Sequence, residues 1–289
     1  MALITVAGFI GAGKSSLTEI IAKEYNSIPF YEKIDSPLLS KLYQATPEEK
    51  KTRRIPFLLQ LEFLNNRFSV IKHSLIEGNN PKMNVLDRSI YEDWYFAKVL
   101  YERGEISSME FELYENLLNN MMEELEELPK KAPDLMIYIK GSFETFIKRI
   151  QKRGRGFELD KETEEYFYEL WSGYDDWLEN HYHASPYLII DADKYDYVEN
   201  EADRVEVLEM INIKLWECGL LEPENPIGET VTISKGEHIG ETGQVQEVFK
   251  SHDGRNMYTI KVEGKKNLRM NFRDELVFHK PNNIGKSFK

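Results

Sequence analysis

The sequence predicts an α/β protein with helices on both faces of a five-stranded parallel sheet, followed by a small all-β domain. Short apolar runs rich in β-branched residues alternate with segments of helical periodicity as far as about residue 218. The first of these runs leads through a glycine-rich turn into a helix. Beyond residue 228, β-branched runs separated by glycines replace the helical segments. Strands that alternate with helices are expected to pair in parallel.

The first strand, turn and helix contain a phosphate-binding pattern. Leu3–Ala7 is a short apolar run, predicted to be a buried strand, and Ser16–Tyr25 has apolar residues at helical spacing. Between them, Gly8–Ser15 fits G-x-x-x-x-G-K-[ST] at every fixed position. Glycines let backbone N–H groups turn toward phosphate oxygens, and the helix N-terminus adds its dipole. The residues predicted to hold phosphate are Gly8, Gly11, Ala12, Gly13, Lys14, Ser15 and Ser16.

The rest of the first domain, predicted to span residues 1–220, follows the same alternation. The segment between residues 35 and 51 is predicted to be loop and short helix, because prolines interrupt it. Apolar runs predict four more strands, at Ile28–Lys33, Met83–Leu86, Leu135–Ile139 and Tyr187–Ile190. Helical spacing predicts helices at Arg53–Glu77, Tyr91–Glu102, Ser107–Leu128, Ser142–Arg153, Glu162–Tyr182 and Asn200–Cys218.

A second domain is predicted at residues 228–280. Gly219–Gly228 contains two prolines and is predicted to be a linker. The β-branched runs that follow predict a small barrel of five strands. The four β-branched runs are Val231–Ile233, Gly243–Val245, Tyr258–Val262 and Leu276–Phe278. From Gly228 to Phe278 this part resembles the small β-barrels of the KOW type.

Composition limits the classes of partner. The chain has 289 residues, of which 41% are hydrophobic and 30% charged, so it can bury a core. Its net charge of −13 disfavours nucleic acid and anionic membranes, except for nucleic acid at the less acidic C-terminal barrel. Cys218 is the single cysteine, which is compatible with a reducing compartment. We expect a cytoplasmic protein, because the N-terminus lacks a basic leader and no run is long enough to span a membrane.

Charged residues stand at the ends of several predicted strands. In open parallel sheets, ligands bind beyond the C-terminal ends of the strands, where Glu32, Asp87, Arg88 and Asp191 are expected to lie. Transfer of a phosphoryl group needs an acceptor, magnesium and positive charge. Glu32 is then a candidate general base, Asp87 a magnesium ligand beside Ser15, and Arg88 a cation for the moving phosphate. Alternatively, Glu32 is a solvated acid, and Asp87 and Arg88 form a structural ion pair.

Two further groups of polar residues are candidates for ligand binding. Gln60 and Arg67 share one face of a predicted helix, and with Asp93 they could hydrogen-bond a base edge. Spacing alone favours three ordinary surface residues at these positions. Three arginines at a helix end form a basic cluster that suits a lid over phosphates, or that interacts with the helix dipole. They are Arg149, Arg153 and Arg155.

Together these residues resemble the motifs of the deoxyribonucleoside kinase family, and most closely those of its bacterial purine branch, over about residues 2–218. Glu32 matches the family's glutamate after the second strand, although Lys33 stands where a proline is usual. Asp87 begins the family's acidic-Arg-Ser motif, where many members have glutamate. The helix motif matches Gln60 and Arg67, and the lid motif matches Arg149, Arg153, Arg155 and Glu158.

The resemblance implies a kinase with a phosphate-binding loop that transfers phosphate from ATP, with magnesium, to the 5′-hydroxyl of a deoxynucleoside. It implies catalytic roles for Lys14, Glu32 and Arg88, and magnesium binding by Ser15 and Asp87. Arg149 would flank the donor adenine, while Arg153 and Arg155 would hold its phosphates. The implied contacts to the acceptor are made by Glu32, Tyr43, Gln60, Arg67, Arg88, Asp93 and Glu158.

The resemblance also implies a homodimer, formed through the helices near residues 53–77 and 90–125. Two alternatives to a deoxynucleoside kinase stay open. A nucleoside monophosphate kinase shares the loop and an Asp-Arg pair, but its acceptor phosphate needs no general base such as Glu32. The other is a non-catalytic nucleotide-binding scaffold, in which the barrel contacts a partner.

Overall fold

The computed structural model describes residues 2–31, 36–76, 83–127, 133–154, 161–221, 223 and 225–279. It separates into two compact units, Met1–Val207 and Leu208–Lys289. Within the described residues, no helix combines the length and apolar character needed to cross a bilayer. The predicted domains, residues 1–220 and 228–280, have other boundaries than these contact-based units, and they stay predictions.

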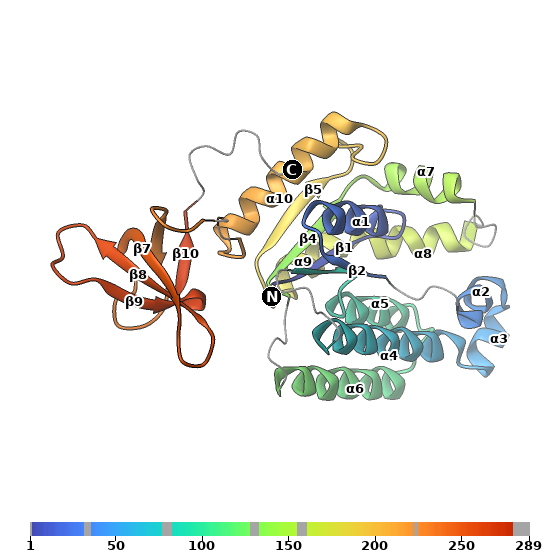
Figure 1. Ribbon diagram of the computed structural model, residues 1–289. Helices are drawn as coiled ribbons and strands as arrows, with labels where there is room; N and C mark the ends of the chain where they lie inside the picture. The colour runs from blue at the N-terminus through green and yellow to red at the C-terminus, as the bar shows by residue number, and fades with distance from the viewer. Residues whose placement is uncertain are drawn as a thin grey trace. The chain divides into compact units, whose positions relative to one another are not determined.

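The first unit is built on a five-stranded sheet in the order β2-β3-β1-β4-β5, and every pairing is parallel (Figure 1). All seven residues of the central strand β1 are buried, as its apolar run predicts. The parallel register sets Val6 beside Asp87, and Gly8 beside Ile139. The strands are β1 (Ala2–Gly8), β2 (Ile28–Phe30), β3 (Met83–Asp87), β4 (Leu135–Lys140) and β5 (Tyr187–Asp191).

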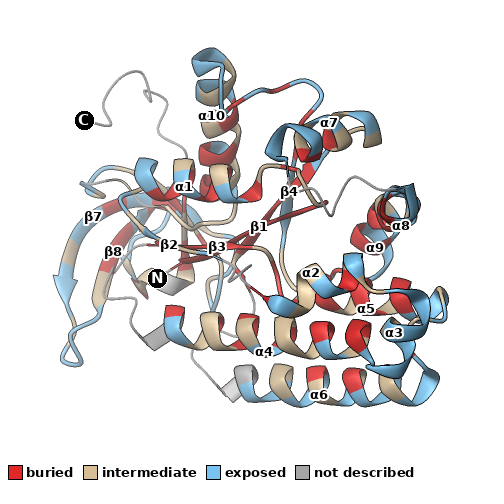
Figure 2. Cartoon of the chain, turned by 90° about the vertical axis from the view of Figure 1, so that its right-hand side faces the viewer, coloured by how far each residue is buried: buried red, intermediate tan, exposed pale blue. Residues whose placement is uncertain are grey.

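Helices cover both faces of this sheet, which confirms the predicted fold class. α1 packs against β1 and β3 on one face, and α4, α5 and α6 lie side by side on the other (Figures 1 and 2). The core between them includes Leu3 and Leu86 from the sheet, and Leu64, Ala97 and Tyr114 from the three helices. The helices are α1 (Lys14–Glu24), α2 (Pro37–Gln44), α3 (Pro47–Thr52), α4 (Ile55–Ile76), α5 (Tyr91–Glu102), α6 (Ser108–Glu127), α7 (Phe143–Arg153), α8 (Lys161–Ser172), α9 (Tyr174–Asn180) and α10 (Glu201–Glu217).

Two of the predicted helical segments differ from the prediction. The helix expected at Glu162–Tyr182 is two helices, α8 and α9, which are separated at Gly173. A Cβ atom at Gly173 would lie 2.5 Å from the Tyr95 hydroxyl, so the close approach of α5 requires glycine there. The segment of residues 35–51 contains two short helices instead of one. Ser36 and Thr46 cap them, and each begins with proline, which is favoured at that position.

The second unit contains a five-stranded antiparallel sheet in the order β10-β6-β7-β8-β9. Its core includes Val231, Val245, Tyr258 and Phe278, and Trp216 from the last turn of α10 packs into the same cluster. β9 was not among the predicted runs, and closure of the sheet into a KOW-like barrel stays a prediction. The strands are β6 (Thr230–Ile233), β7 (Thr242–Lys250), β8 (Asn256–Val262), β9 (Arg269–Phe272) and β10 (Leu276–Phe278).

Candidate active site

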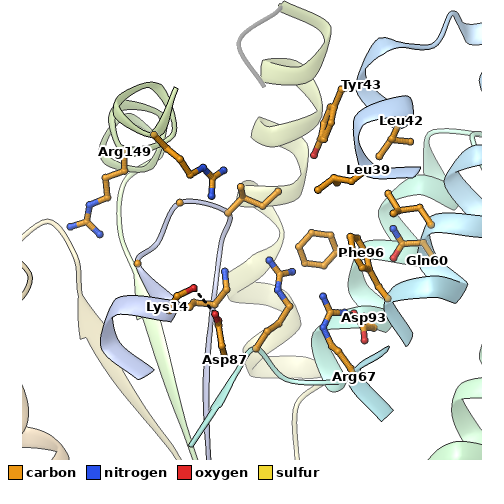
Figure 3. A pocket seen from close by; sticks show the side chains of 18 of the residues that line it. Lys14, Leu39, Leu42, Tyr43, Gln60, Arg67, Asp87, Asp93, Phe96 and Arg149 are labelled. Atoms are coloured by element: carbon orange, nitrogen blue, oxygen red, sulfur yellow. Dashed lines mark hydrogen bonds and ion pairs between the residues drawn. The ribbon is translucent and has the colours of Figure 1, made fainter. Parts of the chain in front are cut away.

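A cavity of about 290 Å³ lies in the first unit, where the C-terminal ends of β1 and β3 meet the helices. Figure 3 shows Lys14, Asp87 and Arg149 on one side of it, and Gln60 and Asp93 on the other. The described residues that line it are Ile10, Gly11, Gly13, Lys14, Ser15, Ser16, Leu39, Leu42, Tyr43, Leu59, Gln60, Phe63, Arg67, Asp87, Arg88, Asp93, Phe96, Arg149, Arg153 and Tyr166.

The phosphate-binding loop has the tight backbone that its glycines predict. Gly8 has φ 138°, and a Cβ atom there would lie 2.7 Å from the carbonyl oxygen of Ile139, so no other residue fits. Gly13, with φ 95°, precedes the first turn of α1. The Lys14 ammonium donates to the carbonyl oxygens of Gly8 at 2.7 Å and Phe9 at 2.9 Å. The loop therefore brings the Lys14 ammonium and the N-terminus of α1 close together, and both attract phosphate.

The Ser15 hydroxyl donates to a carboxylate oxygen of Asp87 at 2.5 Å. Asp87 comes from the end of β3 and Ser15 from the start of α1, so the sheet register brings together two residues far apart in sequence. Hydroxyl and carboxylate oxygens are the ligands that Mg²⁺ prefers. No group of three or more potential metal-ligating side chains occurs in the described part of the chain. A site with two protein oxygens suits magnesium, which is usually held by a few side chains, water and substrate phosphates.

Arg88 follows directly and has φ 78°, a left-handed conformation that is uncommon outside glycine. Its backbone N–H donates to the Val6 carbonyl at 2.9 Å, which ties the turn to β1. Its guanidinium lies over the Phe96 ring, 4.7 Å from the centroid. Strained backbone of this kind is found most often at functional sites. Asp87 and Arg88 both line the cavity, as predicted for a phosphoryl-transfer site.

At the other side of the cavity, the three residues predicted to contact a base come together. Gln60 is 2% exposed, Arg67 6% and Asp93 1%, so they are not the ordinary surface residues that spacing alone favoured. Arg67 forms an ion pair with Asp93, and its guanidinium lies 5.3 Å from the centroid of the Phe63 ring. The side-chain oxygen of Gln60 has no hydrogen-bond partner among the described residues. Buried polar atoms normally have partners, so this acceptor suits a ligand donor.

Arg149 and Arg153, both on α7, line the cavity. Arg149 donates to the carbonyl oxygens of Ala12 at 2.8 Å and Ala192 at 3.1 Å, so it holds the phosphate loop directly. Tyr197, which sequence reasoning missed, donates its hydroxyl to the same Ala12 oxygen at 3.2 Å. Burial raises the pKa of Tyr197 to about 12, so this hydroxyl stays protonated at neutral pH.

The remaining predicted residues have different outcomes. Tyr43 on α2 lines the cavity, and its ring meets that of Phe167 edge-on at 6.1 Å between centroids. Asp191 is not among the residues that line the cavity, and its carboxylate accepts the N–H of Asp193 at 2.9 Å. Glu32, Arg155 and Glu158 lie outside the described residues.

Sequence reasoning also missed the apolar walls of the cavity. Each of these side chains sits on a helical stripe and has the same pattern as a core residue, so the sequence carries no separate signal for them. The helical residues of these walls are Leu39, Leu42, Leu59, Phe63, Phe96 and Tyr166.

The parallel sheet, the phosphate-binding loop and the cavity beside it are those of a kinase of the P-loop class. The chain belongs to the deoxynucleoside kinase family, whose model matches residues 4–215. A deoxyguanosine kinase of Lactobacillus acidophilus is 46% identical, over 76% of this chain and 94% of its own length. A deoxyadenosine kinase of the same organism is 43% identical, over 76% of this chain and 99% of its own.

A solved structure supports the same assignment. The structure of deoxyadenosine kinase from M. mycoides with bound dCTP superposes with a TM-score of 0.58 at 26% identity. It covers 73% of this chain and 98% of the solved one. Membership of the family makes the chain a phosphotransferase and excludes a non-catalytic scaffold.

Proposed function

We propose that the chain transfers the γ-phosphate of ATP to the 5′-hydroxyl of a purine deoxynucleoside, either deoxyadenosine or deoxyguanosine. One observation carries the proposal. A single cavity joins the phosphate-binding loop to the buried group of Gln60, Arg67 and Asp93. A donor triphosphate at one side and a base at the other would place the sugar hydroxyl between them. The similar kinases named for deoxyguanosine and deoxyadenosine support the purine assignment.

The residues at the phosphate side suit transfer through positioning and charge, which is how such enzymes act. Lys14 would leave its carbonyl contacts for a phosphate oxygen of the donor, and Arg88 would neutralise charge on the moving group. Glu32 follows β2 in the chain, and we propose it as the base that accepts the proton of the 5′-hydroxyl. We further propose that Arg149, Arg153 and Arg155 enclose the donor, while Tyr43 and Glu158 hold the sugar.

Magnesium is proposed as the cofactor. The hydroxyl of Ser15 and the carboxylate of Asp87 fit it in chemistry and spacing. Bound there, the ion would neutralise charge on the phosphates of the donor.

The base side favours a base edge with both donors and acceptors. Arg67 can only donate, and an ionised Asp93 can only accept. The amide of Gln60 can do both, as adenine requires at its amino group and ring nitrogen. A thymine methyl would press on the buried ion pair without replacing any hydrogen bond, at roughly 1–3 kcal/mol. We therefore expect deoxycytidine to follow the purines, and thymidine to be the poorest substrate.

An assay coupled to ADP release tests the proposal. The four deoxynucleosides and their four monophosphates are each supplied with ATP and magnesium. We expect turnover of deoxyadenosine or deoxyguanosine, and no turnover of monophosphates. Preference for thymidine would exclude the base contacts proposed here, and phosphorylation of monophosphates would establish the alternative kinase class.

We also propose a cytoplasmic homodimer, formed through α4, α5 and α6, with the kinase domain at residues 1–220 and a barrel at 228–280. The helices are those through which the resembled family pairs. Light scattering after gel filtration should give twice the 34.0 kDa of one chain. A mass of one chain at micromolar concentration would contradict it.

A further inference from the structure

Glu92 is a fully buried carboxylate in the first turn of α5, and it lies outside the cavity lining. One of its oxygens accepts the Ser89 N–H at 3.0 Å. Its other oxygen accepts the Gly8 N–H at 3.0 Å and the Tyr174 hydroxyl at 3.0 Å. Three donors from β1, the turn after β3 and α9 therefore meet on one side chain.

These contacts reach both parts of the phosphate site. Gly8 is the first residue of the phosphate loop, and its carbonyl oxygen accepts the Lys14 ammonium at 2.7 Å. The Tyr174 hydroxyl also lies 3.4 Å from that oxygen. Ser89 directly follows Asp87 and Arg88. The carboxylate thus bridges the segment that holds Lys14 and the turn that presents Asp87 and Arg88.

We propose that Glu92 is a positioning residue that holds the phosphate-binding loop and the Asp87-Arg88-Ser89 turn in one register. Lys14, Arg88 and the Ser15–Asp87 pair then face the same phosphates. The inference rests on the proposed function, because it assumes a nucleotide donor in the loop.

The chemistry of the contacts favours this role over simple capping of the helix. A cap at the start of α5 needs only the hydrogen bond that Ser89 donates to Glu92. The second carboxylate oxygen of Glu92 accepts hydrogen bonds from Gly8 and Tyr174, which lie outside α5. A buried carboxylate is costly to desolvate and is retained only where several donors surround it. Burial, and after it the nearby Glu92, raises the pKa of Tyr174, so its hydroxyl stays protonated and donates.

Two substitutions test the role. Glu92→Gln keeps the shape, but its amide nitrogen cannot accept a hydrogen bond, so at least one donor is left without a partner. We expect the KM for ATP to rise and kcat to fall by about tenfold each, since a bond to a charged group is worth about that factor. The KM for the deoxynucleoside should stay within about twofold, because the base contacts are not altered. Tyr174→Phe removes one donor, and should raise the KM for ATP by about threefold to tenfold.

Tyr95→Phe is the matched control. Its buried hydroxyl donates to the Leu170 carbonyl at 2.5 Å, and Tyr95 lies on the same helix as Glu92 without lining the cavity. It should lower Tm about as much as Tyr174→Phe, with the KM for ATP unchanged. If Glu92→Gln does not fold, the pair of tyrosine variants decides the question. Equal KM values for ATP in the two variants, or an equal rise in both substrates' KM values, would overturn the proposal.

Calorimetric titration with Mg-ADP in the absence of deoxynucleoside separates this inference from the proposed function. We expect wild type and Tyr95→Phe to bind ADP alike, and Glu92→Gln about tenfold more weakly. A wild-type protein that binds ADP but phosphorylates no deoxynucleoside would refute the proposed function alone. Unchanged ADP affinity in both Glu92→Gln and Tyr174→Phe would refute the role of Glu92 alone.

Discussion

Breaking the ion pair between Arg67 and Asp93 should reveal a stability effect that is strongly non-additive. Each side chain is almost fully buried, at 6% and 1% exposure. Removing one partner leaves the other as an uncompensated buried charge, which costs about 3–5 kcal/mol. In a unit of this size, about 2–4 °C of Tm is lost per kcal/mol, so Asp93→Ala should lower Tm by roughly 6–20 °C.

The double variant Arg67→Met/Asp93→Ala should recover most of that loss. Methionine keeps the aliphatic length of arginine against the Phe63 ring, and no charge is left buried. Replacing a buried pair with apolar side chains is often neutral in stability. The double variant should therefore melt several degrees above Asp93→Ala, although it carries one substitution more.

The same double variant should change substrate choice. The two charged groups proposed to hydrogen-bond the base are gone, so kcat/KM for deoxyadenosine should fall by about 100-fold or more, at about 1.5–3 kcal/mol for each charged contact. Thymidine should lose much less, and the ratio of thymidine to deoxyadenosine use should rise. The measurements are thermal melting and kcat/KM for the four deoxynucleosides on all three proteins. A double variant that melts no higher than Asp93→Ala, together with an unchanged substrate ratio, would refute the reasoning.

The site supports three other predictions, for two substitutions and one truncation. Lys14→Ala should weaken ATP binding and slow turnover together, since the charge acts on the bound donor and on the transition state. An unchanged ATP affinity by calorimetry together with an unchanged kcat would contradict this. Glu32→Gln should lower kcat by about 10²–10⁴-fold with deoxynucleoside affinity largely kept, and turnover within a few-fold of wild type would remove Glu32 as the base. A chain ending at Leu221 should retain phosphorylation, because every candidate site residue precedes it; an inactive but folded product would show that the last domain completes the site.

Much of the first unit was predictable because its signals are local. Apolar runs and helical spacing lie within single segments, and the loop pattern requires glycine where the backbone takes positive φ, as at Gly8 and Gly13. The Ser15–Asp87 contact was predictable in outline, since parallel strands bring their ends to one edge.

The unpredicted features depend on contacts between distant segments. The break between α8 and α9 occurs at Gly173 because Tyr95 approaches it from α5, and no neighbour of Gly173 signals that. The burial of Gln60 and Asp93 was missed for a similar reason, since polar residues look like surface until a partner covers them. The Glu92 contacts depend on β1 and α9, which lie far from it in sequence.

The position of Trp216 allows tryptophan fluorescence to follow the unfolding of the two units separately. It lies on α10 but is buried in the core of the second unit, at 5% exposure. The other three tryptophans of the chain, Trp94, Trp171 and Trp177, fall in the first unit. The difference in emission between wild type and Trp216→Phe is therefore a signal from the second unit alone. Measured over a urea titration, that difference spectrum would report the unfolding of the C-terminal sheet. The emission of Trp216→Phe would report the unfolding of the kinase fold.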